Sequence, residues 1–97
     1  MPAKKLKVDW TTKAEIDLQS IYYNLLEKNS AEISGKIRND IFAAPNQIVF
    51  PEQFQFDEYR KDFRRIVVRN FKILYETNGD IVTVITIIDC RRLPSKI

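Results

Sequence analysis

Histidine is absent from the 97 residues of this chain, and cysteine occurs only once, at Cys90. Without histidine, the chain cannot build the Ser–His or Cys–His pairs of nucleophilic catalysis or the usual zinc sites. A single cysteine cannot form an internal disulfide or a thiolate metal cluster, and it fits a reducing compartment. The sequence therefore predicts no metal site and excludes several common classes of hydrolytic enzyme.

Glycine is also scarce, with two residues, and long apolar runs are missing. Two glycines cannot build a Walker or dinucleotide-binding fingerprint, so no cofactor is expected. The first ten residues carry charges but no apolar core of a signal peptide, and no apolar run approaches the length of a membrane span. We expect one soluble, cytoplasmic domain over residues 1–97, with no membrane partner.

The stretch from Asp62 to Arg92 contains three apolar, β-branched runs with only tight turns between them. Asn78-Gly79 predicts a two-residue type I′ hairpin turn, because both central residues of that turn need positive φ. Arg69-Asn70 can close a similar turn. The third run is apolar on both faces, so its strand should be central or covered on both sides. Together the runs predict a three-stranded antiparallel meander over Phe63–Val68, Phe71–Thr77 and Ile81–Ile88.

Upstream of the meander, residues 6–10 alternate apolar and polar side chains and predict a short first strand. A capping box, Thr12-Lys13-Ala14-Glu15, then starts an amphipathic helix that runs to about Lys28. A second capping signature, Asn29–Glu32, starts another helix, and the short connection makes the two an antiparallel hairpin. The apolar stripe of the second helix is Ile33, Ile37, Ile41 and Ala44.

Pro45 should end or kink the second helix, because proline removes a hydrogen bond and clashes with the preceding turn. Whether a last turn resumes through Ile48-Val49 stays open. Phe54 and Phe56 follow in an aromatic segment; we expect them to pack beneath the helices rather than to bind nucleic acid. The predicted fold class is α+β: an N-terminal strand, an antiparallel helix hairpin and the three-stranded antiparallel meander.

Charge is divided unevenly along the chain. Residues 11–59 carry four bases against eight acids, whereas residues 60–97 carry nine bases against four acids. A basic sheet beside an acidic helical cover suggests a polyanion or an acidic peptide as partner, although a solvated sheet face would have the same charges. If the helices cover one face of the meander, the apolar residues on its other face indicate a partner chain.

The cations of the meander are the residues whose chemistry can be assigned. Together with Tyr75 and Asp89, which are nearby in the strand order, these arginine and lysine side chains can bind phosphates and stabilise the charge of a phosphoryl group under attack. Without histidine, a deprotonated Lys72 or Tyr75 would have to transfer protons. Binding requires less of the same residues. The predicted target-binding residues are Arg64, Arg65, Lys72, Arg91 and Arg92.

Three stretches of the sequence carry a family resemblance: VDWTTKAEIDLQSIYYNL, FRRIVVRNFKILYE and ITIIDCRRLPSKI. They resemble the W-x-x-x-A-x-x-D-L opening, the y-R-x-x-v-x-x-y-k-i-x-Y strand pair and the terminal D-x-R-x-x-P of the RelE/ParE superfamily of type II toxin–antitoxin toxins. The resemblance spans nearly the whole chain and implies a β-α-α-β-β-β fold. It also implies a cognate antitoxin, whose flexible segment wraps the sheet and groove of the toxin in a hetero-oligomer.

The resemblance implies one of two activities. RelE-like members cut messenger RNA in the ribosomal A site with basic residues and, in many cases, a C-terminal Tyr or a His; ParE-like members lack that set and act on DNA gyrase. Arg65, Lys72 and Arg91 match the family's basic strand positions, with Arg64 and Arg92 as register alternatives. The resemblance therefore makes Arg65, Lys72 and Arg91 the candidate catalytic residues, with Tyr75 as a possible helper.

This chain has no histidine and no tyrosine after Arg92, and its Asp17-Leu18 opening looks more ParE-like. It therefore resembles the ParE-like, plasmid-stabilisation branch, which implies growth arrest by gyrase binding rather than by enzymatic activity. A RelE-like, ribosome-dependent endoribonuclease is the alternative, and a non-toxic, antitoxin-binding remnant is a weaker one.

Overall fold

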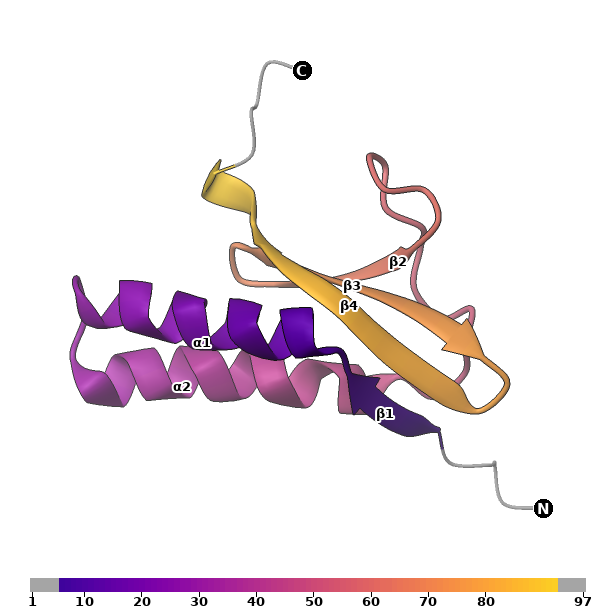
Figure 1. Ribbon diagram of the computed structural model, residues 1–97, viewed down its shortest axis with the longest axis horizontal. Helices are drawn as coiled ribbons and strands as arrows, with labels where there is room; N and C mark the ends of the chain where they lie inside the picture. Colours follow the sequence, from indigo (N-terminus) through magenta and orange to yellow (C-terminus); the bar gives the residue numbers. More distant parts are fainter. Residues whose placement is uncertain (1–5, 93–97) are drawn as a thin grey trace.

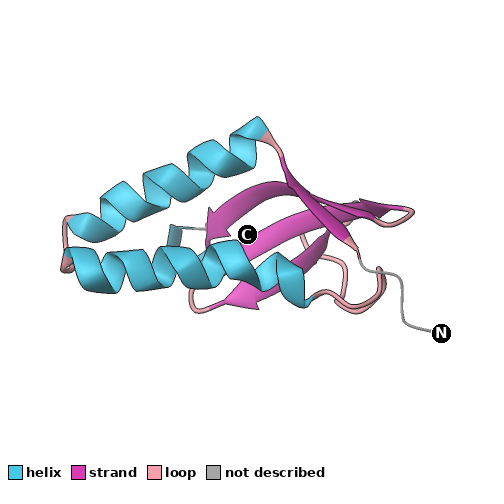
Figure 2. Cartoon of the chain, turned by 90° about the horizontal axis from the view of Figure 1, so that it is seen from below, coloured by secondary structure: helices cyan, strands magenta, loops and turns pink. Residues whose placement is uncertain are grey.

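The computed structural model describes residues 6–92, and in it two helices pack on one face of a four-stranded sheet (Figures 1 and 2). This α+β arrangement, with a strand, a helix hairpin and three further strands, confirms the predicted fold class. None of the helices in the described range is long and apolar enough to span a bilayer. The elements are β1 (Lys7–Trp10), α1 (Thr12–Leu26), α2 (Ala31–Ala43), the 3₁₀ turn η1 (Ala44–Gln47), β2 (Arg64–Val68), β3 (Phe71–Asn78), β4 (Ile81–Asp89) and the 3₁₀ turn η2 (Cys90–Arg92).

The strand order is β1-β4-β3-β2, so β4 lies inside the sheet. This confirms the prediction drawn from its two apolar faces. β2, β3 and β4 are antiparallel neighbours, as the meander predicts, whereas β1 pairs with β4 in parallel. A parallel pairing needs a long crossover, which here includes the helix hairpin and the β2–β3 ribbon.

The turn between β3 and β4 differs from the prediction by one residue. Asn78 pairs with Ile81, so the two central residues of the turn are Gly79 and Asp80. Gly79 has φ 62°, and Arg69 is the one non-glycine residue with positive φ in the described range. A positive φ at the first central position alone fits a type II′ turn, which favours glycine there, and not the predicted type I′ turn.

The helix starts follow the local chemistry of the sequence, with a one-residue correction at the cap of α1 and another at the cap of α2. Thr11, not Thr12, caps α1: its hydroxyl accepts from the Ala14 N–H at 3.0 Å and also donates to the Ile85 carbonyl at 3.0 Å. The second bond ties the start of the helix to β4, which explains why the earlier threonine takes the cap. Ser30, not Asn29, caps α2, one residue after the predicted capping position.

The second helix stops where the proline predicts. α2 ends at Ala43, and Pro45 lies in the following 3₁₀ turn, which ends at Gln47. No helical turn resumes through Ile48-Val49, which answers the question that the sequence left open. At the other end of α2, Ile33 is 49% exposed instead of buried in the predicted stripe. The closed end of the helix hairpin projects beyond the sheet, so the side chain has no sheet residue to pack against (Figure 1).

The hydrophobic core lies between the helices and the sheet face that they cover. Cross-strand pairing places Ile66 beside Ile73 and Ile73 beside Ile87 on this face, and all three are nearly or fully buried. Val8 and Trp10 of β1 pack against the core while remaining half-exposed. The buried core residues are Ala14, Ile21, Ile41, Ala44, Ile48, Ile66, Phe71, Ile73, Tyr75, Val82, Val84 and Ile87.

Candidate functional site

The face of the sheet that points away from the helices carries a buried ion pair. Lys72 Nζ lies 2.7 Å from Asp57 Oδ1, and the two side chains are 7% and 0% exposed. The Tyr59 ring covers the ammonium group at 5.0 Å from its centroid. The lysine that the sequence offers as a proton-transfer or target-binding group is therefore already neutralised by a carboxylate of its own chain.

Asp57 also organises the segment that covers Lys72. Its Oδ2 accepts the backbone N–H groups of Tyr59 at 3.0 Å and Arg60 at 2.8 Å, so the segment folds back over the carboxylate. Burial by itself would raise the pKa of Asp57, but the bond from Lys72 and the two backbone donors together hold that pKa below its usual value. The carboxylate stays ionised, and the ion pair persists at neutral pH.

The two arginines that begin β2 point to opposite faces, because successive strand residues alternate. Arg65 pairs with Leu74 on the face that holds Lys72, and its Nη1 donates to the Phe56 carbonyl at 2.6 Å. Arg64 pairs with Tyr75 on the helix side, and its Nη1 donates to the Phe54 carbonyl at 2.7 Å. Both guanidinium groups thus attach the segment before β2 to the sheet.

The same segment corrects the prediction for the two phenylalanines. Phe54 is half-buried and meets the Tyr75 ring edge-on, with 6.5 Å between the centroids. Phe56 is 52% exposed, and the Arg64 guanidinium lies 4.1 Å from its ring centroid. Only Phe54 supports the core, because the bridge between Phe56 and Arg64 turns the second ring outward.

Tyr75 is fully buried among the core residues beneath the helices, on the opposite face from Lys72. Its hydroxyl is buried with the rest of the side chain, and this burial raises the pKa of Tyr75. A substrate on the face that holds Lys72 has no path to this hydroxyl. The structure therefore separates Tyr75 from the cations that it was predicted to help.

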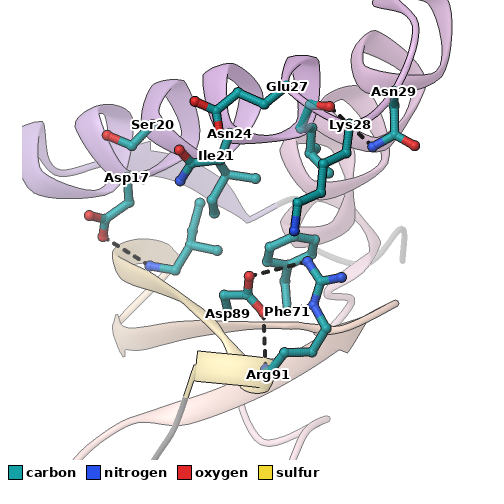
Figure 3. A pocket seen from close by; sticks show the side chains of 12 residues that line it. Asp17, Ser20, Ile21, Asn24, Glu27, Lys28, Asn29, Phe71, Asp89 and Arg91 are labelled. Carbon is teal, nitrogen blue, oxygen red and sulfur yellow. Dashed lines mark hydrogen bonds and ion pairs between the residues drawn. The ribbon is translucent and has the colours of Figure 1, made fainter.

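Arg91 lies in a different place again, in a cleft of about 310 Å³ between α1 and the end of β4 (Figure 3). Its Nε and Nη2 each lie 3.2 Å from a carboxylate oxygen of Asp89, which raises the pKa of the guanidinium. The guanidinium carbon is 6.0 Å from the ring centroid of Phe71, a core residue. Lys28 points toward the same ring from the turn that follows α1 (Figure 3). Arg91 is thus on the helix side, away from Arg65 and Lys72.

The structure does not bring the predicted set together. Arg65 and Lys72 share the open sheet face, whereas Arg64, Tyr75 and Arg91 belong to the helix side. Arg92 ends η2, and its side chain lies outside the described part of the chain. Within residues 6–92, no cluster of acidic, cysteine or histidine side chains is placed to hold a metal ion.

Asp17 attaches α1 to β4, a structural role that the sequence did not predict. Its Oδ2 accepts from the Thr86 hydroxyl and from the Ile87 backbone N–H at 3.1 Å, on the part of β4 beyond its pairing with β1. The sequence signal for this role was the acidic residue of the D-L pair in the opening motif. An exposed helix surface alone does not require an acid at that position.

A second structural feature was also missed: a groove between β1, α1 and α2. It is lined by the aromatic rings of Trp10, Tyr22, Tyr23 and Phe42 and by Arg38. The available sequence signal was the adjacent Tyr22-Tyr23 pair. One ring of that pair is 58% exposed, at Tyr23.

The chain resembles known proteins both in its sequence and in its fold. Residues 8–94 match the family model described as "ParE toxin of type II toxin-antitoxin system, parDE". The structure is similar to a chain of the chromosomal ParDE toxin–antitoxin system from P. aeruginosa, with TM-score 0.75 and 21% identity over 88% of this chain and 96% of that chain. It is also similar to a chain of the RelBE2 toxin–antitoxin complex from Mycobacterium tuberculosis, with TM-score 0.56 and 15% identity over 91% and 97%. No curated protein sequence matches the chain significantly.

Proposed function

This chain belongs to the family of ParE toxins of type II toxin–antitoxin systems, and from that premise we propose that it arrests growth by binding DNA gyrase and is neutralised by a cognate antitoxin. The family membership makes it a toxin of such a module. Gyrase as the target and neutralisation by the antitoxin are our proposal, and the structure's distribution of cations supports the first of them.

The observation that carries the proposal is the ion pair between Lys72 and Asp57. RNA cleavage needs groups that take and give protons beside a phosphate. The central cation of the candidate set is instead buried against a carboxylate, Tyr75 is buried on the far face, and the chain has no histidine. An inhibitor that acts by binding needs none of these groups to be reactive.

We assign the target contact to the open sheet face around Arg65. Val67 and Tyr59 are each 59% exposed there, and both lie close to Lys72: Val67 is its cross-strand partner, and Tyr59 covers its ammonium group. An exposed valine and tyrosine beside a guanidinium group form the mixture of apolar area and charge that protein interfaces favour. This face is also the one that the helices leave uncovered.

The proposal is tested by inducing the protein in cells without its antitoxin and measuring growth, plasmid topology and transcript 5′ ends together. Growth arrest with relaxed plasmid DNA is the expected result. Codon-phased cuts in messenger RNA with normal supercoiling would establish the ribonuclease alternative instead. Normal growth would instead support the weaker alternative, a non-toxic remnant that binds its antitoxin.

Variants of one surface residue make the test specific. Val67→Asp places a charge in the assigned contact and should abolish the relaxation of plasmid DNA. Val49→Asp is the matched control, because Val49 is 63% exposed in the segment after η1. Equal activity of the two variants would place the gyrase contact elsewhere.

A further inference from the structure

The groove between β1, α1 and α2 is separate from the open sheet face, because none of its lining residues comes from β2 or β3. Its volume is about 520 Å³, which is in the usual range of binding pockets. Trp10 stacks on Phe42 with 5.4 Å between the ring centroids, and Phe42 is 54% exposed. With Tyr23 at 58% exposure, two large rings of the groove wall remain largely in contact with solvent.

Exposed aromatic area of this kind marks interaction sites, because it leaves a large apolar surface in water. The remaining wall of the groove adds two acidic side chains. Asp9 and Glu15 line it, and Asp9 Oδ1 lies 4.0 Å from the ammonium nitrogen of the exposed Lys7, which is a loose contact. A cationic guest would therefore meet two carboxylates as well as ring faces.

Arg38 shows what the groove accepts. Its guanidinium carbon lies 4.5 Å from the centroid of the Tyr22 ring, well within the distance of a cation–π contact. A guest with a guanidinium or ammonium group can occupy the equivalent position over Tyr23 or displace Arg38. The groove is therefore suited to a long basic side chain that is flanked by apolar ones.

We infer that the cognate antitoxin docks a basic side chain, flanked by apolar residues, into this groove over Tyr23 and Phe42. The inference rests on the proposed neutralisation by an antitoxin. We assign the groove to the antitoxin and not to gyrase, because the groove carries the acids Asp9 and Glu15 beside Arg38, whereas the assigned gyrase contact around Arg65 is basic. Each of the two partners then has its own surface, of opposite charge.

The first experiment measures the affinity of the purified cognate antitoxin for toxin variants by calorimetry. Tyr23→Ala and Phe42→Ala should weaken binding about tenfold or more, as aromatic residues at the centre of interfaces do. Glu15→Gln should weaken it about two- to fivefold, the range of one exposed cation contact. Phe50→Ala is the matched control, since Phe50 is 52% exposed and lies outside the groove; its binding should stay within about twofold of wild type.

The second experiment tests the charge of the guest. Trp10 is the one tryptophan of the chain and lines the groove, so its fluorescence reports occupancy directly. Fifteen-residue peptides that tile the antitoxin are titrated into the toxin, and the peptide that shifts the Trp10 emission is remade with citrulline for arginine or acetyl-lysine for lysine. The neutral peptide should bind about fivefold or more weakly.

Several outcomes would overturn the inference. Unchanged antitoxin affinity in Tyr23→Ala and Phe42→Ala would do so, as would equal binding of the charged and neutral peptides. Groove variants that bind antitoxin normally but no longer inhibit gyrase would assign the groove to the target. A wild-type dimer in sedimentation that Tyr23→Ala converts to monomer, with antitoxin affinity unchanged, would assign it to a second copy.

The same measurements separate this inference from the proposed function. A toxin that leaves gyrase unaffected but binds antitoxin through the groove contradicts the proposed target alone. Failure of wild type and Phe50→Ala alike to bind the antitoxin contradicts the proposed neutralisation itself. Loss of binding confined to the groove variants supports the inference whatever the target is.

Discussion

Lys72 and Asp57 form an ion pair 2.7 Å long that is almost completely removed from solvent, on the sheet face opposite the helices. Asp57 lies in the irregular segment before β2 and Lys72 in β3, so the pair joins a loop to the sheet. The pair is thus a structural contact at the position where sequence placed a catalytic one.

Asp57→Asn should destabilise the protein by about 3–5 kcal/mol, because it leaves the Lys72 ammonium buried without a counter-charge. Urea denaturation of wild type and variant measures the difference. Asp40→Asn is the matched control: Asp40 pairs with Arg69 at 2.8 Å, but their side chains are 43% and 44% exposed. Loss of that surface pair should change stability by less than about 1 kcal/mol. Equal effects of the two substitutions would contradict the burial of the Lys72 pair.

The stability difference between wild type and Asp57→Asn should depend on pH. The folded pKa of Asp57 is lowered, so its contribution is fully present above the unfolded value of about 3.9 and is lost as pH falls through the folded pKa. Urea midpoints from pH 7 down to pH 2 should therefore converge in acid. A difference that stays constant across this range would show that the carboxylate is not the source.

The two glycines should respond to alanine in opposite directions. Gly79 has φ 62° and nothing within 4 Å of an added Cβ, so Gly79→Ala should destabilise by about 1–2 kcal/mol through backbone strain alone. Gly35 lies inside α2, and its added Cβ would make an ordinary contact at 3.9 Å with Arg38. Gly35→Ala should therefore stabilise by about 0.5–1 kcal/mol. Thermal unfolding compares the pair, and a stabilising Gly79→Ala would refute the type II′ assignment.

Asp17→Ala should destabilise by about 1–3 kcal/mol, because it removes the acceptor for the Thr86 hydroxyl and the Ile87 N–H. Glu27→Ala, an exposed acid at the end of the same helix, serves as its control. Hydrogen exchange of the Ile87 amide localises the effect: exchange should quicken in Asp17→Ala and not in the control. Unaltered protection of this amide would exclude the proposed attachment of α1 to β4.

Local chemistry in the sequence was sufficient for most of the fold. The two apolar faces of β4 indicated a central strand, Pro45 marked the end of α2, and the Asn29–Glu32 signature marked its start to within one residue. The errors were single-residue ones, where a tertiary bond decided between neighbours: Thr11 caps α1 because its hydroxyl also reaches β4. The parallel pairing of β1 could not be read, since it joins residues about seventy positions apart.

The candidate site was less predictable for a physical reason. Strand alternation separates Arg64 from Arg65, but it does not say which face a loop will cover, and the loop supplied the carboxylate that neutralises Lys72. Arg91 follows β4 in η2, where alternation no longer applies, and it turned to the helix side. Residue types gave the charge of the region correctly, whereas the grouping of those charges depended on tertiary structure.

The central claim, inhibition of gyrase by binding to the open sheet face, is tested most directly in a purified supercoiling reaction. Wild-type toxin is titrated into gyrase, relaxed plasmid and ATP, beside Val67→Asp and Val49→Asp. We expect wild type and Val49→Asp to stop supercoiling at concentrations near that of gyrase, and we expect Val67→Asp not to do so. Full supercoiling at a large excess of wild-type toxin would contradict it.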